Sequence, residues 1–338
     1  MILTSFRRPV TIILILFAAA TTLPLASTAA DSVPADLVLT RFSGPDLTPC
    51  VATLCVSAQG EVYAGVDLNG SLGKGPGKGR IVKLIDRDRD GIADSHTVFA
   101  IIDNARGLLA VGSRVYVLHT AHGPDGKATG MNLAVLDDAD RDGIADGPAK
   151  ILVSGICVAK AINDRGTDHS TNGIRMGIDG WIYIAVGDFG FHNATGTDGA
   201  KVTLQGGGVA RVRTDGTELE VFATGTRNDY DVAIDPFMNL FSRGNTNDGG
   251  GWNIRFLHLI QSADYGYPRL FKNFSTEILP ALEDLGGGSG VGAYPHADVR
   301  TLRGPGPVSS RGGRSGRGAG GGRDRAAQAG ARAACPAA

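Results

Sequence analysis

The stretch from residue 160 to residue 192 holds the densest group of side chains able to do acid–base chemistry. Asp168 and His169 are neighbours in it, and Gly187-Asp188 lie near its end. A histidine beside a carboxylate can act as a general base, because the carboxylate orients the imidazole and stabilises its charged form. We therefore take His169 as the candidate general base and Asp168 as its orienting partner. Taken alone, however, the pair fits an ordinary hydrogen-bonded loop histidine better.

Two other stretches share the pattern D-x-D-x-D-G-x-x-D. Their carboxylates are Asp86, Asp88, Asp90 and Asp94 in the first, and Asp138, Asp140, Asp142 and Asp146 in the second. Such carboxylates, with a sharp turn at the glycine and a backbone carbonyl after it, make an oxygen cage that suits Ca²⁺. An EF-hand would carry an acid at position 12, where Thr97 and Ala149 stand. We predict two structural calcium loops, and a solvated Asp-rich turn is the alternative.

Other sequence motifs of known chemistry are absent. The sequence has no phosphate-binding loop, no C-x-x-C-H haem attachment and no H-E-x-x-H zinc motif. Cys50 and Cys55 are close enough in sequence to pair across a short loop, or to remain two free thiols. The sequence leaves these two alternatives open.

The elements that position these residues repeat along the chain. Apolar residues, a turn and an alternating aromatic strand recur at 54–64, 107–117, 173–184 and 231–241. When the copies are aligned on Tyr63, Tyr116, Tyr183 and Phe241, they are 53, 67 and 58 residues apart. Each copy has the period-two pattern of a β-hairpin around a Gly- or Asp-containing turn.

A second hairpin lies between successive copies, at 80–100, 131–153 and 208–223. Two hairpins in each repeat give four strands, which is the blade of a β-propeller. We therefore predict an all-β fold, with a β-sandwich as the alternative. The chain has room for about four to five blades, so we expect an incomplete ring with an exposed sheet edge. In a propeller the polar loops of 160–192 lie at the mouth of the central channel.

The first thirty residues have the pattern of a secretory signal. Arg7 and Arg8 precede an apolar run, and Thr28-Ala29-Ala30 provides a cleavage site before Asp31. The alternative, a single membrane anchor, has too short an apolar run. We expect a cleaved signal over 1–30, a propeller over 31–300 and a periplasmic or extracellular protein with no stable membrane span.

The last segment, 301–338, differs in composition from the rest of the chain. It contains 10 Gly, 9 Ala and 7 Arg with one acidic residue, so it cannot bury enough apolar surface to fold. A frame-shifted end is favoured over a flexible tail, and an exported protein gives little support to a nucleic-acid partner. Without 1–30 and 301–338 the body has 24 basic and 33 acidic residues, a net charge of −9.

Several motifs together resemble a known family. They are Asp168-His169, the stretch 177–183, Gly187-Asp188, Thr226-Arg227-Asn228 and the stretch 231–235. Over about residues 36–300 the chain resembles the soluble quinoprotein glucose/sorbosone dehydrogenases. It is still more similar to the propeller of large secreted bacterial dehydrogenase-like proteins that also carry a cytochrome c domain.

The resemblance implies a six-bladed propeller that holds pyrroloquinoline quinone (PQQ) and Ca²⁺ at its channel mouth. His169 would take the proton of a sugar hydroxyl as a hydride passes to the quinone, and Arg227 and Asn228 would contact the quinone. A cytochrome c would be the electron acceptor. This chain departs from the family at Asp229 and Asp231, where the pattern has Pro and Gly. The sequence leaves open whether it is an enzyme, a non-catalytic binding module or a truncated remnant.

Overall fold

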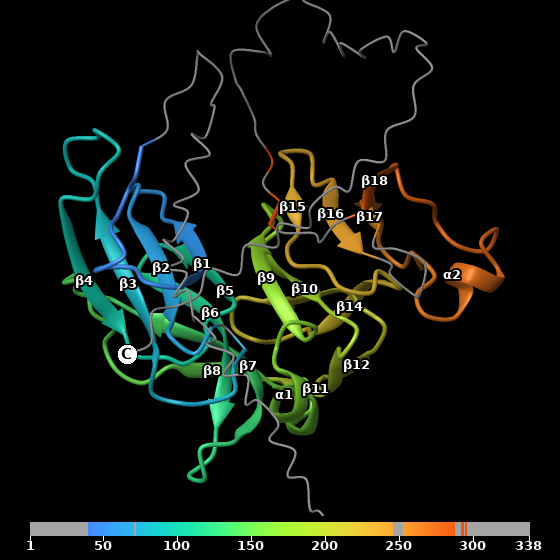
Figure 1. Ribbon diagram of the computed structural model, residues 1–338, viewed down its shortest axis with the longest axis horizontal. Coiled ribbons are helices and arrows are strands. Elements are labelled where there is room, and N and C mark those ends of the chain that lie inside the picture. The colour runs from blue at the N-terminus through green and yellow to red at the C-terminus, as the bar shows by residue number, and fades with distance from the viewer. Residues whose placement is uncertain (1–39, 71, 246–252, 288–291, 294, 296–338) are drawn as a thin grey trace, which may run out of the picture. The chain divides into compact units, whose positions relative to one another are not determined.

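The computed structural model describes residues 40–70, 72–245, 253–287, 292–293 and 295. Backbone contacts divide the chain into Met1–Thr40 and Arg41–Ala338, and every described strand lies in the second unit. Strands make up nearly all of its described regular structure, as Figure 1 shows. The predicted signal and the predicted tail lie outside the described residues. No helix in the described part of the chain is long and apolar enough to cross a membrane.

The first sheet is a four-stranded antiparallel meander. Its strands, in order, are β1 (Val51–Val56), β2 (Val62–Asp67), β3 (Gly79–Ile85) and β4 (Ser95–Ala100). The turn between β1 and β2 uses Gly60 at a φ of 89°, a conformation that glycine adopts without steric cost. β2 and β3 are buried on both faces, which explains their nearly continuous apolar sequence. Both hairpins predicted for this repeat are confirmed.

The second sheet contains the next predicted repeat and one additional hairpin. Its meander is β5 (Gly107–Val111), β6 (Arg114–His122), β7 (Ala128–Asp137) and β8 (Lys150–Ile156). A further hairpin, β11 (Phe191–Gly196) and β12 (Lys201–Leu204), pairs with β8 at its outer edge. The repeat pattern did not predict this hairpin, because it follows the third repeat's inner strands in sequence but joins the second sheet.

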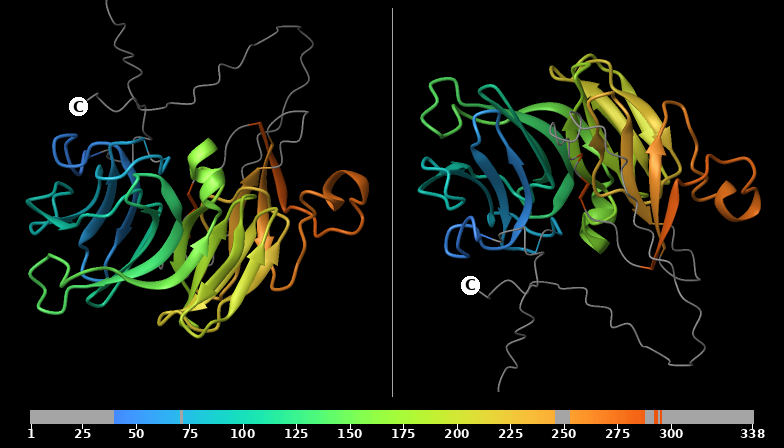
Figure 2. Two further views of the ribbon diagram at one scale, coloured as in Figure 1. Left: turned by 90° about the horizontal axis from the view of Figure 1, so that it is seen from below. Right: turned by 90° about the horizontal axis from the view of Figure 1, so that it is seen from above.

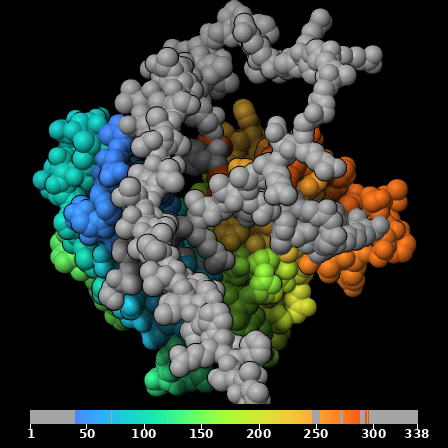
Figure 3. Space-filling view, viewed as in Figure 1, coloured from blue at the N-terminus to red at the C-terminus, as the bar shows by residue number. Residues whose placement is uncertain are grey.

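The third and fourth sheets complete the described strands. The third contains β9 (Thr171–Met176), β10 (Trp181–Val186), β13 (Gly208–Arg213) and β14 (Glu220–Thr224). The fourth contains β15 (Ala233–Ile234), β16 (Leu240–Asn245), β17 (Asn253–Leu259) and β18 (Glu283–Gly287). The two short helices are α1 (Ala159–Arg165) and α2 (Leu270–Asn273). Figure 2 shows the sheets from two further directions, with the colour changing in chain order. In Figure 3 the first sheet and the α2 region lie at opposite sides of the surface.

Successive sheets pack face to face as propeller blades do. The inner strands β1, β5, β9 and β15 contact one another in that order. Apolar side chains from neighbouring sheets share each interface: Tyr63 and Phe99 pack with Val117, and Tyr183 and Phe222 pack with residues of the fourth sheet. Burial of large side chains is the main stabilising contribution at such interfaces. The all-β propeller architecture is therefore confirmed, with four blades in the described residues.

The antiparallel order places the chemically interesting loops at different ends of each sheet. In the second sheet, Arg106 and His122 lie where β5 begins and β6 ends, whereas the second Asp-rich loop joins the opposite ends of β7 and β8. In the first sheet, likewise, the β2–β3 loop and the first Asp-rich loop lie at opposite ends. The Asp-rich loops are thus separated from the other polar cluster by the length of a strand.

Candidate functional site

His169 lies between α1 and β9, and its side chain is held by a carboxylate. Its Nδ1 is 2.5 Å from Oδ1 of Asp188, and the imidazole is buried. The backbone fixes this pair, because Gly187 N–H donates to Ser170 O and Phe189 N–H donates to His169 O. These bonds continue the β9–β10 ladder beyond the strands and bring Asp188 opposite His169. With Nδ1–H directed at Asp188, Nε2 is the atom able to accept a proton.

The predicted orienting partner, Asp168, does not make this contact. Its backbone carbonyl accepts a hydrogen bond from Asn228 Nδ2 at 3.1 Å. Its carboxylate Oδ1 is buried and has no hydrogen-bond partner among the described residues. The structure therefore corrects the assignment of Asp168 as orienting residue in favour of Asp188. Asp168 and His169 are the two central residues of a turn that Ser170 N–H closes by donating to Thr167 O, and of the two only the His169 side chain reaches Asp188.

The ring of His169 is also covered on one side. The Phe189 ring lies 5.5 Å from it between centroids, and the Arg165 guanidinium at the end of α1 lies 5.2 Å over Phe189. This succession of a cation, a phenyl ring and an imidazole limits the positions that the imidazole can take.

Arg227 and Asn228 form a strained turn next to this pair. Arg227 has a φ of 73°, and its N–H donates to Gly206 O at 3.0 Å. A Cβ on Gly207 would lie 2.2 Å from Arg227 O, so only glycine fits against the turn. Asn228 forms an isolated β-bridge with Gly187 and reaches the carbonyl of Asp168. The structure thus brings Arg227, Asn228, Asp168 and His169 together, as the resemblance implies.

The side chains of the turn are buried and polar. The Arg227 guanidinium contacts Asn245 Oδ1 and lies 5.8 Å over the Tyr267 ring. Asn228 is 3% exposed, and its Oδ1 has no hydrogen-bond partner within the described part of the chain. A buried guanidinium and a buried amide on one turn can bind an anionic or carbonyl-bearing ligand.

Two carboxylates stand where the chain departs from the quinoprotein pattern. Asp229 is fully buried, and burial raises the pKa of its carboxyl to about 7, although Arg255 acts in the opposite direction. Burial also raises the pKa of Asp231 to about 6, and Arg175 Nη2 lies 2.5 Å from its Oδ2. The Asp231 carboxylate also accepts from the N–H of Val232 at 2.9 Å, just after the Arg227-Asn228 turn.

The segment Leu72–Gly79 lies against the residues that precede His169. Thr167 N–H donates to Leu72 O at 3.1 Å, and Lys74 Nζ donates to Asp164 O at 3.2 Å. A Cβ on Gly166 would meet Leu72 at about 3.1 Å, so the two backbones pack closely. The β2–β3 loop of the first sheet therefore helps to place the turn that carries His169.

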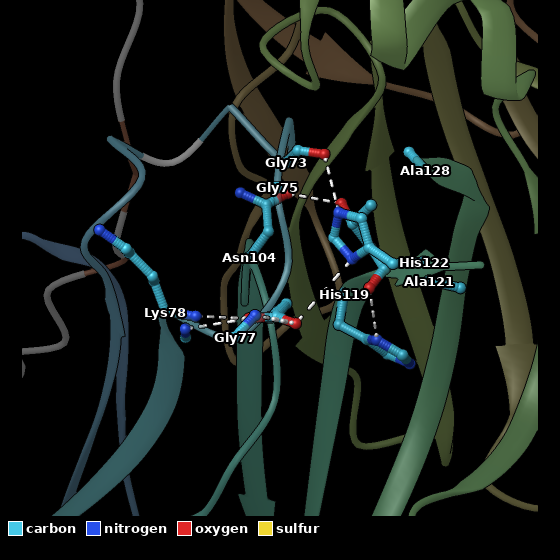
Figure 4. Close-up of polar contacts among 12 residues, drawn as sticks. Gly73, Gly75, Gly77, Lys78, Asn104, His119, Ala121, His122 and Ala128 are labelled. Carbon is cyan, nitrogen blue, oxygen red and sulfur yellow. Dashed lines mark hydrogen bonds and ion pairs between the residues drawn. The ribbon is translucent and has the colours of Figure 1, made fainter. Parts of the chain in front are cut away.

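His122 at the end of β6 and Asp103, in the connection between β4 and β5, hold this segment. Figure 4 shows the His122 imidazole beside Gly73, whose carbonyl is 3.2 Å from Nε2. Asp103 accepts hydrogen bonds from the backbone N–H groups of Gly77, Lys78 and Gly79 at 2.9–3.1 Å. The sequence analysis missed both residues, because neither belongs to a motif.

A buried amide lies beneath the same segment. Asn104 donates from Nδ2 to Asp67 at 3.0 Å, and its Oδ1 accepts from the hydroxyls of Thr120 and Thr167. These partners belong to the first sheet, the second sheet and the approach to β9. Asn104 therefore joins three blades just below the segment that leads to His169.

The two Asp-rich loops have the same backbone structure. Arg89 and Arg141 occupy the left-handed region in them, with φ values of 63° and 60°. In the first loop Asp86, Asp88 and Asp94 bring oxygens within 4.8 Å of one another, and in the second Asp138, Asp140 and Asp142 do so. Asp90 and Asp146 are not part of these clusters, and all the carboxylates of the two loops accept from backbone N–H groups of their own loops. The calcium sites remain a prediction.

The second loop contacts the outer strand of the first blade, and the first loop contacts a residue that precedes the first blade. Ala145 N–H of the second loop donates to Phe99 O on β4, and Lys83 Nζ of the first sheet lies 3.5 Å from Asp138 Oδ2. In the first loop, Ala93 N–H donates to Phe42 O. The carbonyl of Phe42 thus accepts from the first loop the same hydrogen bond that the carbonyl of Phe99 accepts from the second loop. The second loop therefore lies at the boundary between the first and second blades, and both loops lie away from His169.

The cysteine alternatives are settled for the described residues. Cys55 is a buried free thiol, and burial raises its pKa to about 12. Cys50 is disulfide-bonded. Cys50 and Cys55 therefore do not pair with each other.

Residues 52–277 match the family described as "Domain of unknown function (DUF7133)". The chain belongs to this family. No curated protein matches the DUF7133 chain in sequence.

Among solved structures, the DUF7133 chain is similar to the PQQ-bound aldose sugar dehydrogenase from Streptomyces coelicolor. The TM-score is 0.50 at 16% identity, over 72% of this chain and 73% of that one. It is also similar to an oxidoreductase (glucose dehydrogenase) from Thermus thermophilus, with a TM-score of 0.47 at 16% identity over 69% of each chain. At this identity the first likeness concerns the fold, and it agrees with the β-propeller derived above.

Proposed function

We propose that this DUF7133 chain is an exported propeller that oxidises a sugar hydroxyl by hydride transfer to PQQ. The observation that carries the proposal is the His169–Asp188 pair held beside the Arg227-Asn228 turn. The fold that it shares with the PQQ-bound aldose sugar dehydrogenase supports it. Periplasmic location and a cytochrome c electron acceptor belong to the same proposal.

The donor set beside His169 fits an anionic quinone. PQQ carries carboxylates and quinone oxygens, and the Arg227 guanidinium and Asn228 amide are donors suited to such acceptors. Both side chains are buried, at 7% and 3% exposure, so their hydrogen bonds would be little screened by water. We therefore assign Arg227 and Asn228 as the residues that would hold the quinone.

The protein's part in the reaction is proton transfer and charge stabilisation. PQQ, when bound, supplies the hydride acceptor. His169 Nε2 accepts the proton of the sugar hydroxyl, while Asp188 keeps Nδ1 protonated and stabilises the imidazolium that forms. Arg227 and Asn228 stabilise negative charge that develops on the ligand beside them, because their dipoles are already oriented.

Calcium has a structural role in this proposal. The two Asp-rich loops would each bind one Ca²⁺, with ligands from Asp86, Asp88, Asp90 and Asp94 in the first loop and from Asp138, Asp140, Asp142 and Asp146 in the second. Since the second loop contacts the outer strand of the first blade and the first loop contacts Phe42, an ion in each would fix the loop against the part of the chain that precedes it. The ions would not contact the sugar.

Reconstitution tests the proposal. The full chain is incubated with PQQ and Ca²⁺, and oxidation of aldoses is followed with a redox dye. We expect PQQ-dependent turnover that falls by about 10²- to 10⁴-fold in His169→Ala, the usual contribution of a general base. His192→Ala is the matched control, because His192 lies on β11 and contacts only Gln205 among the interactions described. Absence of turnover with PQQ bound would reject the proposal.

A further inference from the structure

A cavity of about 340 Å³ lies among the inner strands β1, β5 and β9. Asn172, at the start of β9, and Tyr230, just after the Arg227-Asn228 turn, line one side of it. His169, Asp188 and the two residues of the turn are not among its described lining residues. The cavity is therefore a neighbour of the candidate site and not the site itself.

Its charged lining is rich in arginine. Arg106 precedes β5, and Arg175 lies on β9, so guanidiniums from two blades line the same space. Asp231 provides a carboxylate, 2.5 Å from Arg175 Nη2. Two guanidiniums and one carboxylate face a cavity in a body whose sequence carries a net charge of −9. Arginine is thus concentrated at this point of an otherwise acidic propeller.

The polar groups are held in place before any ligand arrives. Arg106 Nη2 donates to Asn172 Oδ1, and Asn172 Nδ2 donates to Asp229 O at 3.0 Å. The Arg106 guanidinium also lies 5.7 Å over the Tyr230 ring. Side chains fixed in this way lose little conformational entropy on binding.

We propose that this cavity binds the carboxylate group of a small organic anion. The planar guanidinium matches a carboxylate in two parallel hydrogen bonds, and a crevice with apolar walls focuses its positive potential. Ligand pockets usually measure about 300–1,000 Å³, so this cavity takes a molecule of monosaccharide size. The carboxylate has two chemical sources, a sugar acid or PQQ itself. The proposal concerns binding alone and does not depend on the oxidation proposed above.

Calorimetry on the full chain without PQQ tests the proposal with D-glucuronate and D-glucose, which differ by one carboxylate. We expect glucuronate to bind at least about tenfold more tightly than glucose, and less tightly as NaCl is added. Arg106→Met should weaken glucuronate binding about tenfold or more, and Arg106→Lys should weaken it less. Arg213→Met is the control, because Arg213 stacks on Trp181 at the far end of the third sheet.

The source of the carboxylate is decided by a second titration, with PQQ followed by its absorbance. If glucuronate displaces PQQ and Arg106→Met weakens PQQ binding, the quinone's own carboxylates occupy the cavity. If PQQ and glucuronate bind together, the cavity takes a sugar acid. Equal binding of glucose and glucuronate, with PQQ unaffected by Arg106→Met, would overturn the proposal even if sugars are oxidised. Glucuronate binding without any oxidation would instead reject only the proposed function.

Discussion

At the scale of single residues, the site depends on which carboxylate reaches His169. Sequence adjacency favoured Asp168, whereas the structure places Asp188 at Nδ1. In the structure Tyr183 of β10 lies opposite Arg175 of β9. Extended without change, this register would set Phe189 opposite His169, and the register shift between Ile184 and Val186 sets Asp188 there instead. Such a bulge has no sequence signature, so the partner could not be predicted.

Asp188→Asn is expected to lower turnover by about 10²- to 10⁴-fold while the chain stays folded. The amide keeps the shape of the carboxylate but cannot stabilise the imidazolium, and it can bind the wrong tautomer. Steady-state kinetics of the PQQ-reconstituted chain measure the effect. Asp168→Asn should lower turnover far less, and equal losses in both variants would contradict the assignment.

The raised pKa of Asp229 predicts that the stability of the folded chain depends on pH. An unfolded aspartate titrates at 3.8, whereas burial raises the pKa of Asp229 to about 7 in the folded chain. The folded state therefore binds more protons between these values, so the free energy of unfolding falls as the pH rises from about 4 to about 7. Each pKa unit corresponds to about 1.4 kcal/mol.

Urea unfolding at pH 5 and pH 8 checks this effect. Asp229→Asn should show a smaller loss of stability between the two pH values, by about 1 kcal/mol or more. The exposed Asp125→Asn serves as control and should lose stability as the wild type does. An unchanged pH dependence in Asp229→Asn would show that the buried carboxyl is not the titrating group.

At the scale of elements, hairpins were predictable and their connections were not. The period-two patterns at 54–64 and 173–184 predicted strands that the structure confirms. The β11–β12 hairpin joins a sheet other than that of its sequence neighbours, because pairing with β8 satisfies its backbone groups there. Contacts of this kind between distant segments carry no local pattern.

The contact between His122 and Gly73 should hold Leu72–Gly79 against the approach to His169. Replacing His122 by Phe removes the donor to the Gly73 carbonyl, so backbone amides of 72–79 and 166–170 should exchange hydrogen faster, by about fivefold or more. His122→Gln keeps an N–H donor at a similar distance and should restore part of the protection. Hydrogen exchange with mass spectrometry measures both variants. The same protection in His122→Phe as in His122→Gln would contradict the role of this contact.

At the scale of the whole molecule, the four repeats were enough to predict a propeller, and the shared inter-blade cores explain why. Aromatic residues at the aligned repeat positions, such as Tyr63 and Tyr183, are buried between one blade and the next. The repeating sequence pattern therefore reflects the packing that each blade interface requires. The polar network of Asn104 was not predictable, since its partners come from three separate segments of sequence.

Calcium should stabilise the whole propeller, because one Asp-rich loop lies at the boundary between the first two blades and the other contacts Phe42 ahead of the first blade. At a concentration about 100 times its Kd, an ion contributes about 2.7 kcal/mol at each site, which corresponds to an increase in Tm of about 5–10 °C. Thermal unfolding in Ca²⁺ against EDTA measures the shift, with Mg²⁺ as control. Asp88→Asn combined with Asp140→Asn should abolish most of it. The same Tm in Ca²⁺ and EDTA would reject the calcium prediction.

The central claim is that His169, oriented by Asp188, takes the proton as a sugar reduces PQQ beside Arg227 and Asn228. The most direct measurement is single-turnover reduction of PQQ bound to the full chain, followed by stopped-flow absorbance after mixing with an aldose. We expect fast reduction in the wild type and a rate lower by about 10²- to 10⁴-fold in His169→Ala, with PQQ still bound. Equal rates in the two proteins, or no reduction of bound PQQ in the wild type, would contradict the claim.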